Sequence, residues 1–317
     1  MRSQAVVISE PGHVELREVA LNRPGPDDLL IETAFTSISA GTERMLLAGQ
    51  MPHPMLSLPV VPGYETVGRV AEVGANVPAE WAGQWVYIGG ALCYDGLNAA
   101  WGGQSQRLFA PQSRTIPLDG VAPEQGVLLA LTATALHGID LLSLQGGERL
   151  LVLGQGPVGQ LAARLAQRQG AVVTVADRIA SRLARSVAES VINVSAQPLN
   201  EQITAPVDII VEASGSMAAL AEALPLLNSN GTILLLGYYQ TLNLPYMPLF
   251  LKQARLLTAK EWAANDLQRS RDLIASGALE VGSLLTHRMP VTQIEAAYET
   301  ALNDPDCLKL VLEWETL

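Results

Sequence analysis

Positive charge, cysteine and long apolar runs are all scarce in this chain of 317 residues. Lysine and arginine number 20 against 31 aspartate and glutamate, for a net charge of −11. Proteins that bind nucleic acid neutralise phosphates with clustered basic side chains, so this balance argues against a nucleic-acid partner. The first residues lack an apolar core of the length that a secretory signal needs, and we expect none.

The two cysteines, Cys93 and Cys307, lie far apart and form no CxxC motif. A structural zinc site needs several closely spaced ligands, so the spacing disfavours a thiolate zinc site. So few cysteines fit a reducing compartment, and we expect a cytoplasmic protein. The most apolar window, residues 126–144, is interrupted by His137 and Asp140. It predicts a buried helix and no integral membrane segment.

The pattern of apolar residues changes after Pro123. Before it, short alternating runs separated by turn residues predict a β-rich barrel or sandwich. After it, strands and helices alternate, which predicts a parallel sheet. The expected strands there are 148–154, 171–177, 207–215 and 231–239, and the expected helices are 157–169, 180–189 and 216–227. Two further helices, near 265–276 and 292–303, and a strand over 307–314 close the α/β fold.

The motif GQGPVG at residues 154–159 fits the dinucleotide-binding pattern GxGxxG, and it lies between an apolar strand and a helix, as that pattern requires. Gly154 allows a tight turn, Gly156 lets the backbone approach a pyrophosphate, and Gly159 lets the helix pack against the strand. Pro157 and Val158 open the helix, whose free N–H groups attract phosphate. We expect a nicotinamide dinucleotide here.

Asp177 ends the next predicted strand, where a carboxylate accepts the ribose hydroxyls and repels a 2′-phosphate. This favours NAD over NADP. Arg178 follows directly, and it leaves open a 2′-phosphate contact or a place against the adenine. Ligands of such sheets bind at the carboxyl ends of strands, so the next two strand ends should line the cofactor cleft. The cofactor-binding candidates there are Ala213, Ser214, Gly237 and Tyr238.

The whole layout resembles the medium-chain dehydrogenase/reductase superfamily. The segments GANVPAEWAGQWV (74–86) and GGQSQRLFAP (102–111) resemble its strand-turn-strand unit and the strand that leads to its domain crossover. The resemblance implies a GroES-like catalytic domain at 1–120 and a Rossmann domain at 121–258. The segment 259–317 would then return to complete the catalytic domain.

A closer resemblance is to the bacteriochlorophyllide a dehydrogenase family. It is carried by SISAGTERMLLAGQMP (37–52), VPGYETVGRV (61–70), KEW (260–262) and DPDCLKLVLEW (304–314). It implies NAD-dependent oxidation of the 3-(1-hydroxyethyl) group of a bacteriochlorophyllide to an acetyl group. The tetrapyrrole substrate follows from the resemblance alone. A homodimer and a transient association with a membrane surface stay open.

The resemblance also locates the catalytic zinc of related enzymes, at positions that here hold Ser39, Tyr64 and Ala130. Hydroxyl oxygens are poor zinc ligands beside thiolate or imidazole, and alanine offers none. The loop that carries four cysteines in zinc-containing relatives holds only Cys93. We therefore expect no metal at either position.

Without a metal, another group must take the alcohol proton and stabilise the alkoxide. The candidates are Ser39, Thr42, Tyr64 and Glu65. The Tyr64 phenol could bond to the substrate oxygen, but its ordinary pKa of about 10 is high for a base at neutral pH. Glu65 could accept the proton, or hold Tyr64 or an arginine. Alternatively, Tyr64 only fills the space that the metal site vacates.

Other polar residues are open at this point. Glu43 and Arg44 are either functional or a solvated charge pair. His137 is interpreted as a satisfied helix histidine, and His53 as a loop residue with a minor claim to line the cleft. The stretch 238–250 predicts either an apolar wall for a macrocycle or a dimer edge.

Two other functions remain. One is a zinc-free quinone or enone reductase that uses NADPH, which Asp177 disfavours. The other is a non-catalytic dinucleotide-binding protein.

Overall fold

The computed structural model describes residues 1–52 and 57–315. The chain divides into two compact units. The first contains residues 1–130 and 271–317, and the second contains residues 131–270. The predicted domain limits of 1–120, 121–258 and 259–317 stay a prediction.

Two sheets form the first unit. One has the order β2-β1-β4-β7. Its strands are β1 (Arg2–Glu10), β2 (His13–Ala20), β4 (Val60–Val61) and β7 (Asn98–Ala99). The other has the order β16-β17-β3-β5-β6-β9, with β8 paired to β3. Its strands are β3 (Asp28–Ser37), β5 (Thr66–Val73), β6 (Trp85–Ile88), β8 (Arg107–Pro111), β9 (Thr115–Pro117), β16 (His287–Pro290) and β17 (Leu310–Glu313).

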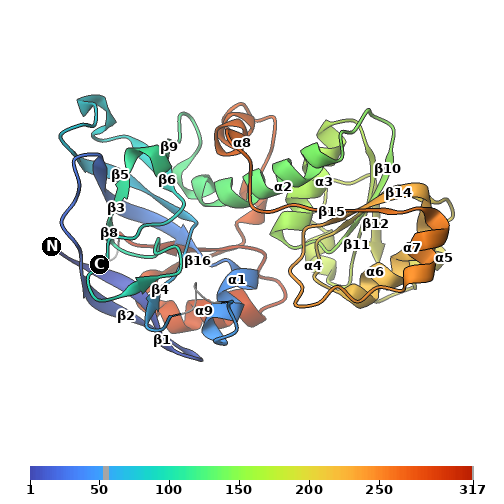
Figure 1. The fold of residues 1–317 in the computed structure, drawn as a ribbon, viewed down its shortest axis with the longest axis horizontal. Helices are drawn as coiled ribbons and strands as arrows, with labels where there is room; N and C mark the ends of the chain where they lie inside the picture. The colour runs from blue at the N-terminus through green and yellow to red at the C-terminus, as the bar shows by residue number, and fades with distance from the viewer. Residues whose placement is uncertain (53–56, 316–317) are drawn as a thin grey trace. The chain divides into compact units, whose positions relative to one another are not determined.

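The C-terminal strand β17 joins the N-terminal part of the chain, and in Figure 1 the red end of the chain lies among blue strands. β17 pairs antiparallel with β3 through Val311 opposite Ser37. The indole Nε1 of Trp314 donates to Thr36 Oγ1 at 2.9 Å, and Trp314 is fully buried. This pairing brings the residues just before β17 to the end of β3, where the candidate catalytic segment begins.

Two helices complete this part of the first unit, α1 (Ala40–Leu47) and α9 (Ile294–Asn303). Both contribute to one apolar core with β1, β4 and β17, which includes Leu46, Tyr298 and Leu310. A second core lies between β1, β3, β6 and β8. Because α1 packs on this core through Leu46, its first turn has a defined place beside the ends of β3 and β4.

The second unit holds a parallel sheet of order β12-β11-β10-β13-β14-β15. This is the doubly wound order, with its switch point between β10 and β13. The strands are β10 (Arg149–Leu153), β11 (Val172–Asp177), β12 (Ser190–Asn193), β13 (Val207–Glu212), β14 (Leu227–Leu235) and β15 (Arg255–Thr258). Its helices are α3 (Pro157–Arg168), α4 (Ala180–Leu183), α5 (Leu199–Gln202), α6 (Met217–Ala223) and α7 (Tyr246–Lys252).

Two helices run across the limits between the units: α2 (Leu129–Leu141) and α8 (Asp266–Ala275). The predicted α/β class is confirmed, and α2 lies within the apolar window 126–144. The expected helix at 180–189 is shorter, because α4 ends at Leu183 and β12 begins at Ser190. Among the described residues, no helix is both long and apolar enough to span a bilayer.

Candidate active site and dinucleotide-binding segment

Three hydroxyl groups meet at the start of α1. Ser39 precedes the helix and Thr42 lies in its first turn, while Tyr64 follows the Pro62-Gly63 turn after β4. The Tyr64 hydroxyl is 2.5 Å from Ser39 Oγ and 3.2 Å from Thr42 Oγ1. The Trp101 ring stands edge-on to the Tyr64 ring, with centroids 5.0 Å apart. The structure thus brings together three of the four candidate catalytic residues.

Tyr64 is a hydrogen-bond donor at neutral pH rather than a base. Burial raises the pKa of its phenol well above the usual 10, and the nearby Glu65 carboxylate raises it further. A protonated phenol can stabilise a developing alkoxide, and this is the role that the geometry allows.

Glu65 belongs to a buried ion pair. Its Oε2 contacts Lys309 Nζ and accepts from Ser37 Oγ. Both charged side chains are almost completely buried, and Lys309 Nζ also donates to the Ile38 carbonyl at 3.2 Å. The partner of Glu65 is therefore Lys309, and the expectation that Glu65 holds Tyr64 or an arginine is wrong. Its other oxygen, Oε1, is buried and has no hydrogen-bond partner.

Glu43 is the residue whose importance the sequence left undecided. It is 1% exposed, so the solvated charge pair with Arg44 is excluded. Its Oε1 accepts from the Ser39 amide at 3.0 Å, and its Oε2 accepts from Gln104 Nε2 at 2.9 Å and from the Tyr298 hydroxyl. Arg44 instead donates to the Leu302 carbonyl. A capping box has its glutamate three residues after the serine that precedes the helix, whereas Glu43 is the fourth, so no local signal marked this residue.

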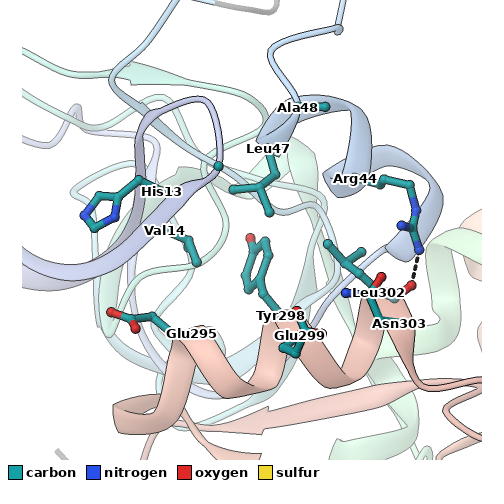
Figure 2. Close-up of a pocket in the computed structure, with 11 residues that line it drawn as sticks. His13, Val14, Arg44, Leu47, Ala48, Glu295, Tyr298, Glu299, Leu302 and Asn303 are labelled. Carbon is teal, nitrogen blue, oxygen red and sulfur yellow. Dashed lines mark hydrogen bonds between the residues drawn. The ribbon is translucent and has the colours of Figure 1, made fainter.

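Tyr298 connects Glu43 to a surface groove of about 480 Å³ in the first unit. Figure 2 shows Tyr298 rising from α9 with Val14 on one side and Leu47 above it, while His13 and Glu295 lie further out. Burial raises the pKa of Glu43 from 4.5 to about 7, opposed mainly by the hydrogen bonds from Tyr298 and Ser39. Glu43 therefore changes charge near neutral pH.

The glycine motif of the second unit has the geometry that its pattern requires. Gly154 has φ +89°, and a Cβ there would lie 2.7 Å from the Ser214 backbone. A Cβ on Gly159 would lie 2.0 Å from the Gly154 carbonyl oxygen. Gly156 faces open space, and Pro157 is the first residue of α3. Gly154 thus makes the tight turn, Gly156 leaves room for a ligand to approach, and Gly159 allows the close contact of the helix.

Asp177, at the end of β11, is tied to the glycine loop. Its Oδ2 accepts from the Gln155 amide at 2.6 Å, and its Oδ1 accepts from the Ile179 amide at 2.8 Å. Each carboxylate oxygen can accept a second hydrogen bond, so ribose hydroxyls can still bind. The Arg178 side chain is exposed.

The buried carboxylate of Glu212 lies close to the residues that follow both β13 and β14. Glu212 Oε1 accepts from the Ser214 amide at 2.8 Å, and Oε2 accepts from the Gly215 amide at 3.1 Å. A Cβ on Gly237 would lie 2.7 Å from Glu212 Oε2. Ala213 and Ser214 therefore lie close to the glycine loop, with Gly237 beside them. Tyr238 is half exposed at the edge of this group.

Comparison with known proteins agrees with both units. The model "Alcohol dehydrogenase GroES-like domain" matches residues 25–120, and the model "Zinc-binding dehydrogenase" matches residues 157–276. The 2-desacetyl-2-hydroxyethyl bacteriochlorophyllide A dehydrogenase of Rhodobacter capsulatus is 35% identical, with 99% of each chain covered. The enzyme of the same name from Cereibacter sphaeroides is 34% identical over the same shares.

The chain belongs to the bacteriochlorophyllide dehydrogenase family of medium-chain dehydrogenases. It is an oxidoreductase that acts on CH–OH groups.

Solved structures share the whole fold. A dehydrogenase of Sinorhizobium meliloti bound to NADP has a TM-score of 0.87 at 23% identity, with 99% of this chain and 100% of that chain covered. Acetophenone reductase of Geotrichum candidum in complex with NAD has a TM-score of 0.85 at 21% identity, with 99% and 97% covered.

The residues of this chain do not fit the zinc that the family model's name implies. The positions that the resemblance assigns to the zinc ligands of related enzymes hold Ser39, Tyr64 and Ala130, which supply two hydroxyls and a methyl group. Within residues 1–52 and 57–315, no three histidine, cysteine, aspartate or glutamate side chains form a group that could hold a metal. Glu65, which follows Tyr64 in the chain, is already paired with the Lys309 ammonium, and that positive charge would repel a divalent metal ion. His53 lies outside the described residues.

Proposed function

We propose that this protein oxidises the 3-(1-hydroxyethyl) group of a bacteriochlorophyllide to a 3-acetyl group, with NAD and without zinc. The single observation that carries the substrate is the likeness, at 34% and 35% identity over 99% of the chain, to two bacteriochlorophyllide dehydrogenases. The three neighbouring hydroxyls of Ser39, Thr42 and Tyr64 support the reaction class, because they can donate hydrogen bonds to an alcohol oxygen.

In this proposal each candidate has a distinct role. When bound, NAD would supply the acceptor for the hydride of the alcohol carbon. Tyr64 donates its O–H to the substrate oxygen, while Ser39 and Thr42 orient the phenol. We assign the alcohol proton to Glu65, whose Oε1 has no partner while Oε2 is held by Lys309. A buried carboxylate oxygen with an unused lone pair is an acceptor that still lacks a donor.

The proposal of NAD rests on Asp177. Its carboxylate lies against the Gln155 amide, in the loop where the ribose of a dinucleotide is recognised. A 2′-phosphate placed beside this carboxylate would meet a like charge. Gly154, Gly156, Pro157, Val158 and Gly159 would hold the pyrophosphate. The strand ends at Ala213, Ser214, Gly237 and Tyr238 would line the rest of the cleft, with Arg178 exposed at its margin.

The decisive experiment combines purified protein, NAD and the hydroxyethyl bacteriochlorophyllide in one cuvette. We expect NADH formation together with a red shift of the long-wavelength band, because the new acetyl group joins the conjugated system. Cofactor binding without either change would contradict the proposal. NADPH-dependent reduction of an enone or quinone would instead support the reductase alternative. Metal analysis completes the experiment, since one tightly held zinc per active chain would overturn the zinc-free part.

Tyr64→Phe tests the central residue. The variant removes the O–H donor but keeps the ring against Trp101, so the space stays filled. We expect kcat to fall about 100-fold or more, the size seen when one donor to an oxyanion is removed. Unchanged turnover would show that Tyr64 only occupies the volume of the vacated metal site.

We further propose a cytoplasmic homodimer that uses the exposed apolar face of α7. The Tyr246 and Phe250 rings stack with centroids 5.7 Å apart and are 69% and 58% exposed. Leu251 is 70% exposed, and β15 next to this helix ends the order of the sheet. Exposed apolar groups of this kind mark interaction surfaces. Sedimentation of the protein and of Phe250→Glu should show a dimer and a monomer respectively. A monomeric native protein would leave this face to the substrate or a membrane surface.

A further inference from the structure

We propose that Glu43 is a positioning residue that holds both sides of the Ser39–Tyr64 hydroxyl pair in place, and that it holds them most firmly while it is ionised. This inference deepens the proposed function and rests on it. Glu43 does not touch the Tyr64 hydroxyl in the described structure. It acts through Ser39 on one side and through Gln104 on the other.

The first side is the start of α1. Ser39 precedes this helix, yet its side chain makes no capping bond to the helix backbone. Its Oγ is used for Tyr64 instead, while its amide donates to Glu43 Oε1. The Glu43 amide in turn donates to the Ser39 carbonyl at 2.8 Å. The backbone of Ser39 is thus held at its amide and its carbonyl by one residue, and this fixes the direction of its hydroxyl.

The second side is the turn that carries Tyr64. The side-chain Nε2 of Gln104 donates to Glu43 Oε2 at 2.9 Å. The backbone N–H of Gln104 donates to the Pro62 carbonyl at 3.0 Å. A Cβ on Gly63 would lie 2.5 Å from Gln104 Cγ, so the turn rests directly on this side chain. The hydrogen bond from Gln104 to Glu43 therefore supports the turn that carries Tyr64.

All three partners of the Glu43 side chain donate to it: the Ser39 amide and the Gln104 NH₂ group can only donate, whereas the Tyr298 hydroxyl can also accept. An ionised carboxylate accepts from Ser39, Gln104 and Tyr298 together, whereas a protonated one must use one oxygen as a donor. On protonation the new O–H can donate to the Tyr298 hydroxyl, but the bonds from Ser39 and Gln104 become neutral ones, about half as strong as bonds to an ionised carboxylate. The hold on Ser39 and Gln104, and with it on the hydroxyl pair, would then weaken.

The charges that face Glu43 come from other elements of the same unit. The Glu65 carboxylate raises the pKa of Glu43 and the Lys309 ammonium lowers it, while the Tyr298 hydrogen bond lowers it from α9. Burial is the largest effect and brings the pKa to about 7. A change of charge near neutral pH would therefore act on the geometry of the site.

The variant Glu43→Gln replaces one acceptor oxygen by an NH₂ group and keeps the shape. We expect kcat to fall about 10- to 100-fold, as for a misplaced catalytic group, with KM changed much less. We also expect the increase of kcat with pH through about 7 in the native enzyme to disappear. Arg44→Gln, on the same helix but bonded to the Leu302 carbonyl, is the matched control and should leave kcat and its pH profile unchanged.

Tyr298→Phe gives a second, milder test. It removes a hydrogen bond that lowers the pKa of Glu43, so the rise of kcat should move to higher pH with the maximum rate retained. If Glu43 had a purely structural role, the rise of kcat would stay at the same pH in Tyr298→Phe. Native rates and an unchanged pH profile in both variants would overturn the proposal.

One measurement does not depend on turnover. Infrared titration of the protein without substrate should show a protonated carboxyl that appears as the pH falls through about 7, and that is missing in Glu43→Gln. Absence of this signal in the native protein refutes the inference about Glu43. Presence of the signal in a protein that does not oxidise the tetrapyrrole refutes only the proposed function.

Discussion

Replacing Lys309 by methionine should strongly destabilise the first unit. The substitution keeps the apolar stem of the side chain but removes the ammonium that contacts Glu65 Oε2 and donates to the Ile38 carbonyl. Glu65 is completely buried and its Oε1 already has no partner, so its charge would remain in a low-dielectric interior with only the Ser37 hydroxyl. Loss of one partner of a buried ion pair costs about 3 to 5 kcal/mol.

Tryptophan fluorescence during urea unfolding can measure this loss. Four of the five tryptophans, Trp81, Trp85, Trp101 and Trp314, belong to the first unit, so the signal reports mainly on that unit. With a slope of about 2 kcal/mol per molar urea, the transition should move to lower urea by about 1.5 to 2.5 M. The transition of the second unit, followed through dinucleotide binding, should not move.

The double variant Lys309→Met with Glu65→Gln separates the charge from the packing. It removes the unpaired charge, and it should recover most of the stability, because a neutral pair of similar size often replaces a buried ion pair without loss. If the single variant moves the urea midpoint by less than about 0.5 M, the pair is more hydrated than its burial indicates. If the double variant is as unstable as the single one, packing and not charge is responsible.

Three further predictions concern the two units separately. Between pH 4.5 and about 7, Glu43 binds a proton in the folded state but not in the unfolded state. The free energy of unfolding should therefore fall by about 3 kcal/mol as pH rises through this range. Denaturant unfolding of Glu43→Gln should not show this dependence on pH. Gly159→Ala places a Cβ 2.0 Å from a carbonyl and should destabilise the second unit by at least about 1–3 kcal/mol in thermal unfolding, whereas Gly156→Ala should fold normally and bind NAD more weakly in calorimetry. Asp177→Ser should weaken NAD about 10- to 100-fold relative to NADP in a cofactor titration, since it removes charged hydrogen bonds to the ribose; equal losses for both cofactors would contradict that role.

The dinucleotide segment shows how far local sequence reaches. The strand, the glycine loop and the start of α3 are adjacent in the chain, so residues 149–168 already contain the turn, the cap and the apolar pattern. The parallel sheet followed from alternating runs for the same reason. The shortness of α4 and the existence of β12 did not, because they depend on packing against β11 rather than on their own propensity.

The candidate catalytic residues could be predicted from the sequence only in part. Ser39, Thr42 and Tyr64 were named as candidates from motifs, and the structure brings their hydroxyls together, but their support was not visible in the sequence. Glu43 looked like one of two charges in a polar loop, and only its burial separates it from Arg44.

The sequence by itself determined the fold class, the glycine loop and the candidate hydroxyl residues, because these depend on neighbours within a few residues or on residue identity. Only the tertiary structure decided the partners of the buried charges. Lys309 reaches Ile38 across 271 positions, and Tyr298 reaches Glu43 across 255. Such pairs have no local signature, since they form only when β17 pairs with β3 and α9 packs beside α1. Burial then sets the pKa of Glu43, and burial is a property of the folded chain.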